Sequence, residues 1–263
     1  MVLVTLTSDL GLRDNYVALV KAAILKRVPE AQIIDISHET ERFNAIRAAY
    51  LFEHAFRAFP ENSWHLVGLK SNLEAERLLF VRMDNQNVIC PDNGFITLIE
   101  GYEQAKIFVL DPNLYPFKLF AMKSAMVDAF DFLVQPGNLE RQLKMVICED
   151  FQVLTRMLPV INSNSLVGSC IYVDDFGNVV TNITTEIFEK AGKGRKFKIQ
   201  LPGTAVFQIR KDYPEAQDTD ALAIFNSFGH LEIAINRSKA IKMLFPNDMQ
   251  YRGNFNVTVD FLA

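Results

Sequence analysis

Polar residues able to bind a ligand gather in three short stretches, and the first of them follows an apolar strand signal. Residues 2–4 are Val-Leu-Val and residues 5–16 read TLTSDLGLRDNY, which includes Asp9 and Asp14. Apolar residues then recur at helical spacing, and Asp14 or Asn15 is placed to cap that helix. We therefore expect Asp9 at the carboxyl end of a strand, the edge where open α/β sheets bind ligands.

The chemistry expected of this stretch is that of a carboxylate acceptor. Its single glycine, Gly11, matches neither the G-x-G-x-x-G fingerprint nor a P-loop, so the stretch does not predict a pyrophosphate site. A carboxylate accepts hydrogen bonds, which suits hydroxyl donors such as a ribose diol. The alternative interpretation is that Asp9 and Asp14 act only as turn and capping residues.

The second and third stretches lie between apolar, β-branched runs in the second half of the chain. They read YVDDFGNVVTN over residues 172–182 and NSFGHLEIAIN over residues 226–236. Hairpin turns explain both, because such turns use Asp, Asn and Gly. Both also combine an aromatic ring with acceptors and an amide, which suits a purine: an amide can pair with its edge and a phenyl ring can stack on its face. The candidate binding residues are Asp174, Phe176 and Asn178 in the second stretch, and Ser227, Phe228, Glu232 and Asn236 in the third.

Length and composition limit the classes of function. With 263 residues the chain has room for one large domain or two smaller ones. Its formal net charge of −4, with no Lys/Arg block, gives no case for nucleic-acid binding. No apolar run is long enough to span a membrane, and no signal peptide is evident, so we expect a cytoplasmic protein. Cys90, Cys148 and Cys170 are scattered in apolar surroundings, which indicates reduced core thiols.

Strand and helix patterns alternate in the first half of the chain. Strands are predicted at residues 2–4, 32–36, 64–69, 78–83, 88–90 and 106–110, and helices follow Asp14 and span residues 44–59, 95–100 and 121–133. This alternation predicts an α/β N-terminal domain over residues 1–155, with a mostly parallel sheet covered on both faces.

The pattern changes after Pro159. A polar Asn-Ser-Asn-Ser run at residues 162–165 indicates a linker, which we place at residues 156–166. Residues 167–263 then predict an all-β, barrel-like C-terminal domain, with short strands separated by turn residues. Those strands are expected at residues 167–173, 179–183, 196–201, 205–209, 221–225, 231–235 and 256–261.

The order and spacing of these motifs resemble one family, the S-adenosylmethionine hydroxide adenosyltransferases, which also include the fluorinating and chlorinating enzymes. The matching pieces are SDLG at residues 8–11 with Asp14, IDISHE at 34–39, PDNG at 91–94, DxFGNxxTN at 174–182 and SFGHLEIAxN at 227–236. The resemblance covers nearly the whole chain. It implies an α/β domain followed by a β-barrel domain, and a homotrimer that binds its ligand where one subunit's N-terminal domain meets a neighbour's C-terminal domain.

The resemblance also implies roles for individual residues. Asp9 would accept hydrogen bonds from the ribose hydroxyls, and Phe43 falls where an aromatic wall of the nucleoside pocket lies. Asp14 would face the methionine ammonium of an S-adenosylmethionine ligand. In the second domain, Asp174 and Glu232 would face the same ammonium, Phe176 and Phe228 would stack around the purine, Asn178 would contact its edge, and Ser227 and the backbone at Asn236 would complete the pocket.

The sequence departs from the family at the catalytic positions. Hydrolysing members generate hydroxide with an Asp, an Arg and a His. Here the Asp position is Leu69 or Lys70, the His position is Lys118, and Arg77 could be a surviving Arg. We therefore take Arg77, Lys70 and Lys118 as the candidate catalytic residues.

The two lysines change the electrostatics of a site for a sulfonium cation. At about 4 Å and an effective dielectric constant of about 20, an ammonium would repel the sulfonium by about 4 kcal/mol. A charged lysine would thus favour a neutral or anionic adenosine compound. Burial could instead lower the lysine pKa and leave a neutral amine to act as a base.

Three functions remain open at this point. The first is hydrolysis of S-adenosylmethionine to adenosine and methionine. The second is nucleoside binding without catalysis. The third is a metal-assisted hydrolase with Asp9, Asp14 and Asp92 as oxygen ligands, but no ligand spacing favours it, so we expect neither a metal nor a cofactor. Nothing identifies a halide pocket.

Overall fold

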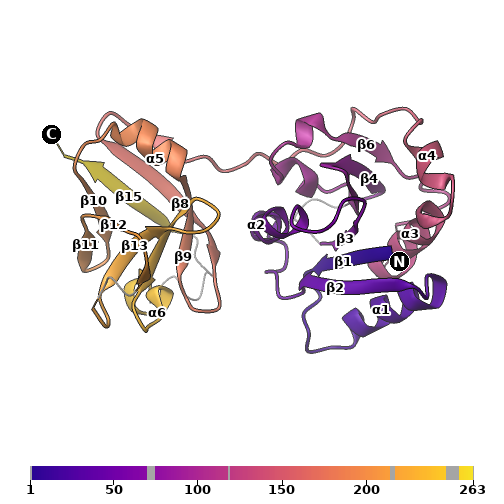
Figure 1. The fold of residues 1–263 in the computed structure, drawn as a ribbon, viewed down its shortest axis with the longest axis horizontal. Helices are drawn as coiled ribbons and strands as arrows, with labels where there is room; N and C mark the ends of the chain where they lie inside the picture. Colours follow the sequence, from indigo (N-terminus) through magenta and orange to yellow (C-terminus); the bar gives the residue numbers. More distant parts are fainter. Residues whose placement is uncertain (1, 70–74, 118, 214–216, 247–254, 263) are drawn as a thin grey trace. The chain divides into compact units, whose positions relative to one another are not determined.

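The computed structural model describes residues 2–69, 75–117, 119–213, 217–246 and 255–262. The chain divides into two compact units, unit 1 at Met1–Arg156 and unit 2 at Met157–Ala263. Figure 1 shows helices together with strands in unit 1, and a curved sheet with two helices in unit 2.

Unit 1 is built on a six-stranded sheet with the order β2-β1-β3-β5-β4-β6. The strands are β1 (Val2–Ser8), β2 (Ala31–Ser37), β3 (Trp64–Gly68), β4 (Leu78–Met83), β5 (Gln86–Pro91) and β6 (Lys106–Val109). The pairs β1–β2, β1–β3 and β3–β5 are parallel, whereas β4 runs antiparallel to both of its neighbours. The prediction of a mostly parallel sheet is confirmed. Its carboxyl edge carries Asp9, His38, Leu69 and Asp92, together with Arg77 at the start of β4.

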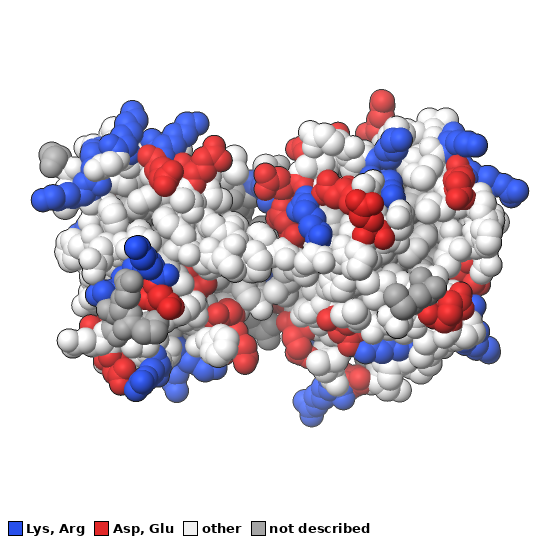
Figure 2. Space-filling view, viewed as in Figure 1, with Lys and Arg blue, Asp and Glu red and all other residues white. Residues whose placement is uncertain are grey.

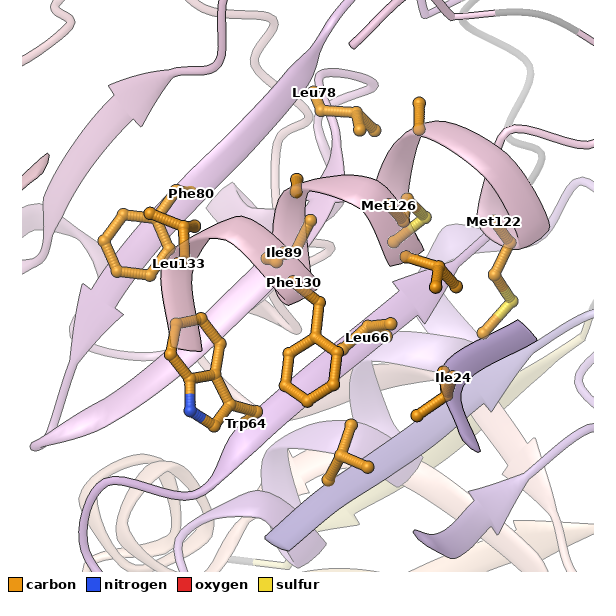
Figure 3. Close-up of a cluster of buried hydrophobic side chains, with 14 of the residues drawn as sticks. Ile24, Trp64, Leu66, Leu78, Phe80, Ile89, Met122, Met126, Phe130 and Leu133 are labelled. Carbon is orange, nitrogen blue, oxygen red and sulfur yellow. The ribbon is translucent and has the colours of Figure 1, made fainter. Parts of the chain in front are cut away.

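Helical segments cover both faces of this sheet because its strands alternate apolar residues between two cores. On one face, Leu66, Phe80 and Phe108 pack with α1 (Tyr16–Arg27), α3 (Val127–Val134) and the π-helical turn η3 (Met122–Met126). Figure 3 shows this cluster, in which the ring centroids of Trp64 and Phe130 are 5.5 Å apart.

On the opposite face, Val67, Leu79 and Val88 pack against α2 (Ala45–Phe56) and the short 3-10 helix η1 (Phe95–Leu98). Two smaller elements complete the helical segments described in unit 1. They are η2 (Tyr102–Gln104) and α4 (Asn138–Gln142).

Unit 2 is a mostly antiparallel, nearly closed β-barrel. Its strands are β7 (Val160–Ile161), β8 (Ser165–Val173), β9 (Val179–Thr184), β10 (Phe197–Leu201), β11 (Thr204–Val206), β12 (Ile209–Arg210), β13 (Ala221–Phe225), β14 (His230–Ile235) and β15 (Asn256–Phe261). The sheet order is β11-β10-β15-β8-β9-β14-β13-β12, and β7 pairs with β8. The barrel-like C-terminal domain is therefore confirmed.

Several local predictions need correction. Unit 2 is not purely β, because it contains α5 (Thr185–Gly192) and α6 (Ala240–Leu244). The hydroxyl of Thr184 caps α5 by accepting a hydrogen bond from the Ile187 amide, 3.3 Å away. In unit 1, Asn15 precedes α1 but its side chain makes no capping bond. Within the expected linker, residues 160–161 form β7.

The cysteines differ in burial. All three are free, but only Cys90 is fully buried, and burial raises the pKa of its thiol far above the ordinary range. Cys148 and Cys170 are partly exposed, so the prediction of core thiols holds fully for Cys90 alone. Among the described residues, no helix is long and apolar enough to cross a membrane.

Candidate functional site

The turn after β1 presents Asp9 at the carboxyl edge of the unit 1 sheet, as its position in the sequence predicts. Asp9 is partly exposed and Asp14 is exposed. Neighbouring backbone fixes the turn, because the Gly11 amide donates to the His38 carbonyl over 2.7 Å and the Leu12 amide donates to Glu39 Oε1 over 2.7 Å. Gly11 has a φ of 71°, a left-handed conformation that favours glycine. The Asp9 carboxylate is thus carried by a closely held turn.

A hydrogen-bonded chain of side chains begins at Ser8, the residue before Asp9, and ends at a partly exposed ion pair. Ser8 and His38 are both buried, and Ser8 Oγ lies 2.6 Å from His38 Nδ1. The other ring nitrogen, Nε2, lies 3.0 Å from an Asp35 oxygen, and Lys21 Nζ lies 2.5 Å from the second oxygen. Burial acts to raise the pKa of Asp35, but hydrogen bonds from Lys21 and His38 outweigh it and hold the pKa below its usual value.

Phe43 lies in the segment between β2 and α2, in a strained conformation. Its φ is 63°, which is uncommon for an aromatic residue, and the side chain is 48% exposed. The residues on either side are anchored: Glu41 pairs with Arg47 over 2.9 Å, and Asn44 Oδ1 accepts a hydrogen bond from the Arg47 amide. Such strain costs about 1–3 kcal/mol and is common at ligand-binding sites. Both features suit the aromatic wall expected at this position.

The candidate catalytic residues do not assemble into a set within the described part of unit 1. Leu69 is buried in the apolar core beside α2. Arg77 Nε donates to Asp92 over 2.8 Å, and the guanidinium also donates to the Asp150 carbonyl. The other Asp92 oxygen accepts the Gln152 amide. Arg77 therefore holds the carboxyl edge to a later segment of the chain.

The other catalytic candidates, Lys70 and Lys118, lie outside the described residues. Across the described ranges, no group of three or more His, Cys, Asp and Glu side chains is arranged to hold a metal ion. The described residues therefore give no support to the metal-assisted hydrolase, in which Asp9, Asp14 and Asp92 would be the ligands.

In unit 2, the turn between β8 and β9 folds around Asp174. Its two oxygens accept the backbone amide of Asn178 over 2.8 Å and the side-chain amide of the same residue over 3.1 Å. Gly177 has a φ of 82°, and a Cβ there would lie 2.6 Å from Lys239 Cβ. The ring of Phe176, at the tip of this turn, is 77% exposed. The turn thus combines a fixed acid and amide with an open aromatic surface.

Glu232 on β14 extends this turn into a network. The side chain is only 5% exposed. Oε1 accepts the Tyr213 hydroxyl over 2.6 Å and Oε2 accepts the Asn226 amide over 3.3 Å, while Asn178 contributes a further hydrogen bond. Burial and the nearby Asp174 charge raise the pKa of Glu232, and these hydrogen bonds only partly offset the rise.

The turn between β13 and β14 carries the remaining predicted residues. Asn226 Oδ1 accepts the backbone amides of Phe228 and His230, which fixes the turn. Ser227 is exposed and Phe228 is 49% exposed. Farther along, the backbone of Asn236 donates to Asp220 and accepts from Thr219.

The structure therefore brings Asp174, Asn178 and Glu232 into one network. The sequence-based prediction missed Tyr213 and the role of Asn226 in that network, as well as the contact between Ser8 and His38. Figure 2 shows charges of both signs interspersed on the visible face of each unit.

The chain is similar to known proteins along most of its length. A model of the SAM hydroxide adenosyltransferase N-terminal domain matches residues 4–136, and one of the C-terminal domain matches residues 168–245. An (R)-S-adenosyl-L-methionine hydrolase of Methanocaldococcus jannaschii is 28% identical, with 92% of this chain and 91% of that protein covered. A fluorinase of Nocardia brasiliensis is 25% identical, with 94% of each chain covered.

Solved structures extend the similarity to the fold. The crystal structure of an uncharacterized conserved protein from Thermotoga maritima has a TM-score of 0.77 and 25% identity, covering 98% of this chain and 99% of that one. The crystal structure of a conserved hypothetical protein from Thermus thermophilus has a TM-score of 0.69 and 25% identity, with both chains fully covered. Since the two domain models together match most of its length, the chain belongs to the SAM hydroxide adenosyltransferase family.

Proposed function

We propose that this chain binds S-adenosylmethionine or a closely related adenosine compound. The observation that carries the proposal is the unit 2 network, in which Asp174, Asn178 and Glu232 are held together beside the exposed rings of Phe176 and Phe228. The rings offer stacking surfaces for a purine. The NH2 group of Asn178 donates to Asp174 and Glu232, so its side-chain oxygen is the atom that suits a donor on a purine edge. The two carboxylates suit an ammonium group.

Unit 1 supplies a complementary set of ligand groups in this proposal. Asp9 accepts the ribose hydroxyls, Phe43 lines the nucleoside and Asp14 faces the ammonium. In a homotrimer, these residues of one subunit would act with the unit 2 residues of a neighbouring subunit. The support from unit 1 is the position of Asp9 at the carboxyl edge of the sheet and the strained, half-exposed Phe43.

The reaction proposed for the bound compound is hydrolysis to adenosine and methionine. Water, after losing a proton to a base, attacks the ribose C5′. The C5′–sulfur bond breaks and its electron pair stays on sulfur, which leaves neutral methionine as the second product. Lys70 or Lys118, as a neutral amine, is the candidate base. Arg77 is the third catalytic candidate, as a permanent cation that could orient the attacking water but could not take its proton.

A second candidate function is nucleoside binding without catalysis, and specific observations favour it. Leu69 has no acid or base group that could activate water, and it is buried in an apolar core. Arg77 is already engaged by Asp92 and by the Asp150 carbonyl. Hydrolysis therefore depends on Lys70, Lys118 or a rearranged Arg77.

Two measurements on the purified protein separate these functions. Isothermal titration with S-adenosylmethionine and with adenosine tests binding, and chromatography after incubation with S-adenosylmethionine tests turnover. Binding of both compounds, lost in Asp9→Ala and retained in Ser169→Ala, would support the site. Adenosine formed only with the enzyme would establish hydrolysis, and binding without adenosine would establish the second candidate. Failure of the wild-type protein to bind either compound would refute the proposal.

A further inference from the structure

The Tyr213 side chain reaches the site from a part of the chain that the recognised motifs do not include. It follows β12 and its ring is about one-third exposed. Its hydroxyl donates to Glu232 Oε1 over 2.6 Å, a short distance typical of a hydrogen bond to an ionised carboxylate. Tyr213 and Glu232 are 19 positions apart in the sequence, so this contact exists only in the folded barrel.

Glu232 needs this donor because of what surrounds it. On the neighbouring strands its partners in register are Val180 and Ile224, which are apolar and buried. The ionisable groups that act on it are Tyr213 and Asp174, and the Asp174 charge opposes ionisation. The amides of Asn226 and Asn178 are its other hydrogen-bond donors. An ionised carboxylate buried in this way is stable only when donors satisfy its oxygens.

The surroundings of the phenol also act on its proton. Burial, the hydrogen bond to Glu232 and the charges of Glu232, Asp174 and Asp212 raise the pKa of Tyr213 far above its usual value. The phenol therefore keeps its proton at neutral pH and remains a donor. This fixes the direction of the hydrogen bond, from Tyr213 to Glu232.

We propose that Tyr213 is a positioning residue of the ligand site, which holds Glu232 ionised and oriented toward the ammonium group of the bound compound. The inference rests on the proposed function, because it assumes a ligand with an ammonium group. In this role Tyr213 helps the site to discriminate between S-adenosylmethionine and adenosine. Adenosine lacks the ammonium, so its binding does not depend on this hydrogen bond.

The test compares Tyr213→Phe, which removes only the hydroxyl, with Ser169→Ala as the matched control. Ser169 Oγ donates to Asn256 where β8 pairs with β15, and neither residue takes part in the Glu232 network. The variant therefore removes one hydroxyl without touching that network. Carbon-detected NMR of the glutamate carboxyl groups gives the pKa of Glu232 without any ligand. Calorimetry gives the dissociation constants of S-adenosylmethionine and adenosine. It is carried out between about pH 5 and pH 8, the range in which a carboxyl group with a raised pKa changes its charge.

We expect Tyr213→Phe to raise the pKa of Glu232 by about one unit. We also expect it to weaken S-adenosylmethionine binding about tenfold, with the loss starting at a higher pH than in the wild type. Adenosine binding and all values for Ser169→Ala should match the wild type.

Each other outcome has one meaning. An unchanged pKa of Glu232, or an equal loss for both compounds, would overturn the role of Tyr213 while leaving the proposed function intact. A wild-type protein that binds neither compound would instead refute the proposed function. In that case, a shifted Glu232 pKa in Tyr213→Phe would show that the hydrogen bond is only structural.

Discussion

The turns that carry Asp9 and Asp174 are built alike but are held in different ways. Each places a glycine with positive φ shortly after the acid, at 71° for Gly11 and 82° for Gly177. The first turn is held from outside, by hydrogen bonds to the segment after β2. The second closes on itself, because Asn178 donates to Asp174 twice, and it then packs against the start of α6. Similar local geometry can thus depend on distant residues in one unit and on local ones in the other.

One buried ionisable group of each unit has a pKa that burial shifts, and the two groups are of opposite kinds. In unit 1 this group is the imidazole of His65, and in unit 2 it is the carboxylate of Glu232. Burial favours the neutral imidazole of His65, so a falling pH destabilises the fold around it. A carboxyl group whose pKa is raised by folding stabilises the fold most when it is protonated, so a rising pH destabilises the fold around it. The two units should therefore respond to pH in opposite directions.

The largest expected effect comes from filling the space at the second turn. In Gly177→Ala the new Cβ would lie 2.6 Å from Lys239 Cβ, in addition to the unfavourable positive φ. We expect a loss of about 4 kcal/mol of stability in unit 2. Hydrogen exchange of the β9 and β14 amides measures that loss.

Gly11→Ala is the matched variant for this prediction. A Cβ at Gly11 would lie 3.8 Å from Glu39 Oε1, so only the backbone cost of about 1 kcal/mol remains. Fluorescence of Trp64, the only tryptophan in the sequence, reports unfolding of unit 1. Equal losses in the two variants would mean that α6 does not restrict the second turn.

The next effect is the opposite response of the units to pH. Burial lowers the pKa of His65 from 6.5 to about 4, although a hydrogen bond with Gln86 acts the other way. Between these values the unfolded chain binds a proton that the native unit does not. As pH falls from 6.5 to about 4, unit 1 should lose about 3 kcal/mol of stability. Urea unfolding followed by Trp64 fluorescence measures it, and His65→Gln should remove the loss.

Unit 2 should show the reverse trend at Glu232. Its native pKa is raised above the ordinary value of 4.5, so the native unit holds the proton to a higher pH than the unfolded chain. The stability that this group contributes is therefore present below pH 4.5 and is lost as pH rises through the native pKa. Glu232→Gln should flatten this dependence in β14 hydrogen exchange. Parallel pH curves for the two units would refute the comparison.

Much of the fold could be predicted from the sequence because its determinants are local. Alternating strand and helix patterns predict the sheet of unit 1, and dense turn signals predict the barrel of unit 2. The helix α5 was missed because eight residues in a β-rich region give a short periodic signal. Its Thr184 cap is the feature that could have revealed it.

The site was predicted only as far as single motifs extend. Asp9, Asp174 and Asn178 lie in turns that the local composition of the sequence predicts. The contacts between Tyr213 and Glu232, and between Ser8 and His38, join residues 19 and 30 positions apart, so no local pattern encodes them. Likewise, the sequence cannot show that Arg77 is engaged by Asp92.

The smallest expected effect tests what holds the first turn. In His38→Ala the buried hydroxyl of Ser8 loses its partner, and we expect unit 1 to lose about 2 kcal/mol, measured by urea unfolding with Trp64 fluorescence. Lys21→Ala is the control, because it removes the exposed end of the same chain. Lys21 and Asp35 are each about one-third exposed, so solvent weakens their pair and its loss should cost less than about 1 kcal/mol. A larger loss in Lys21→Ala than in His38→Ala would place the anchor of the Asp9 turn at the surface ion pair, and the buried contact between Ser8 and His38 would then be incidental.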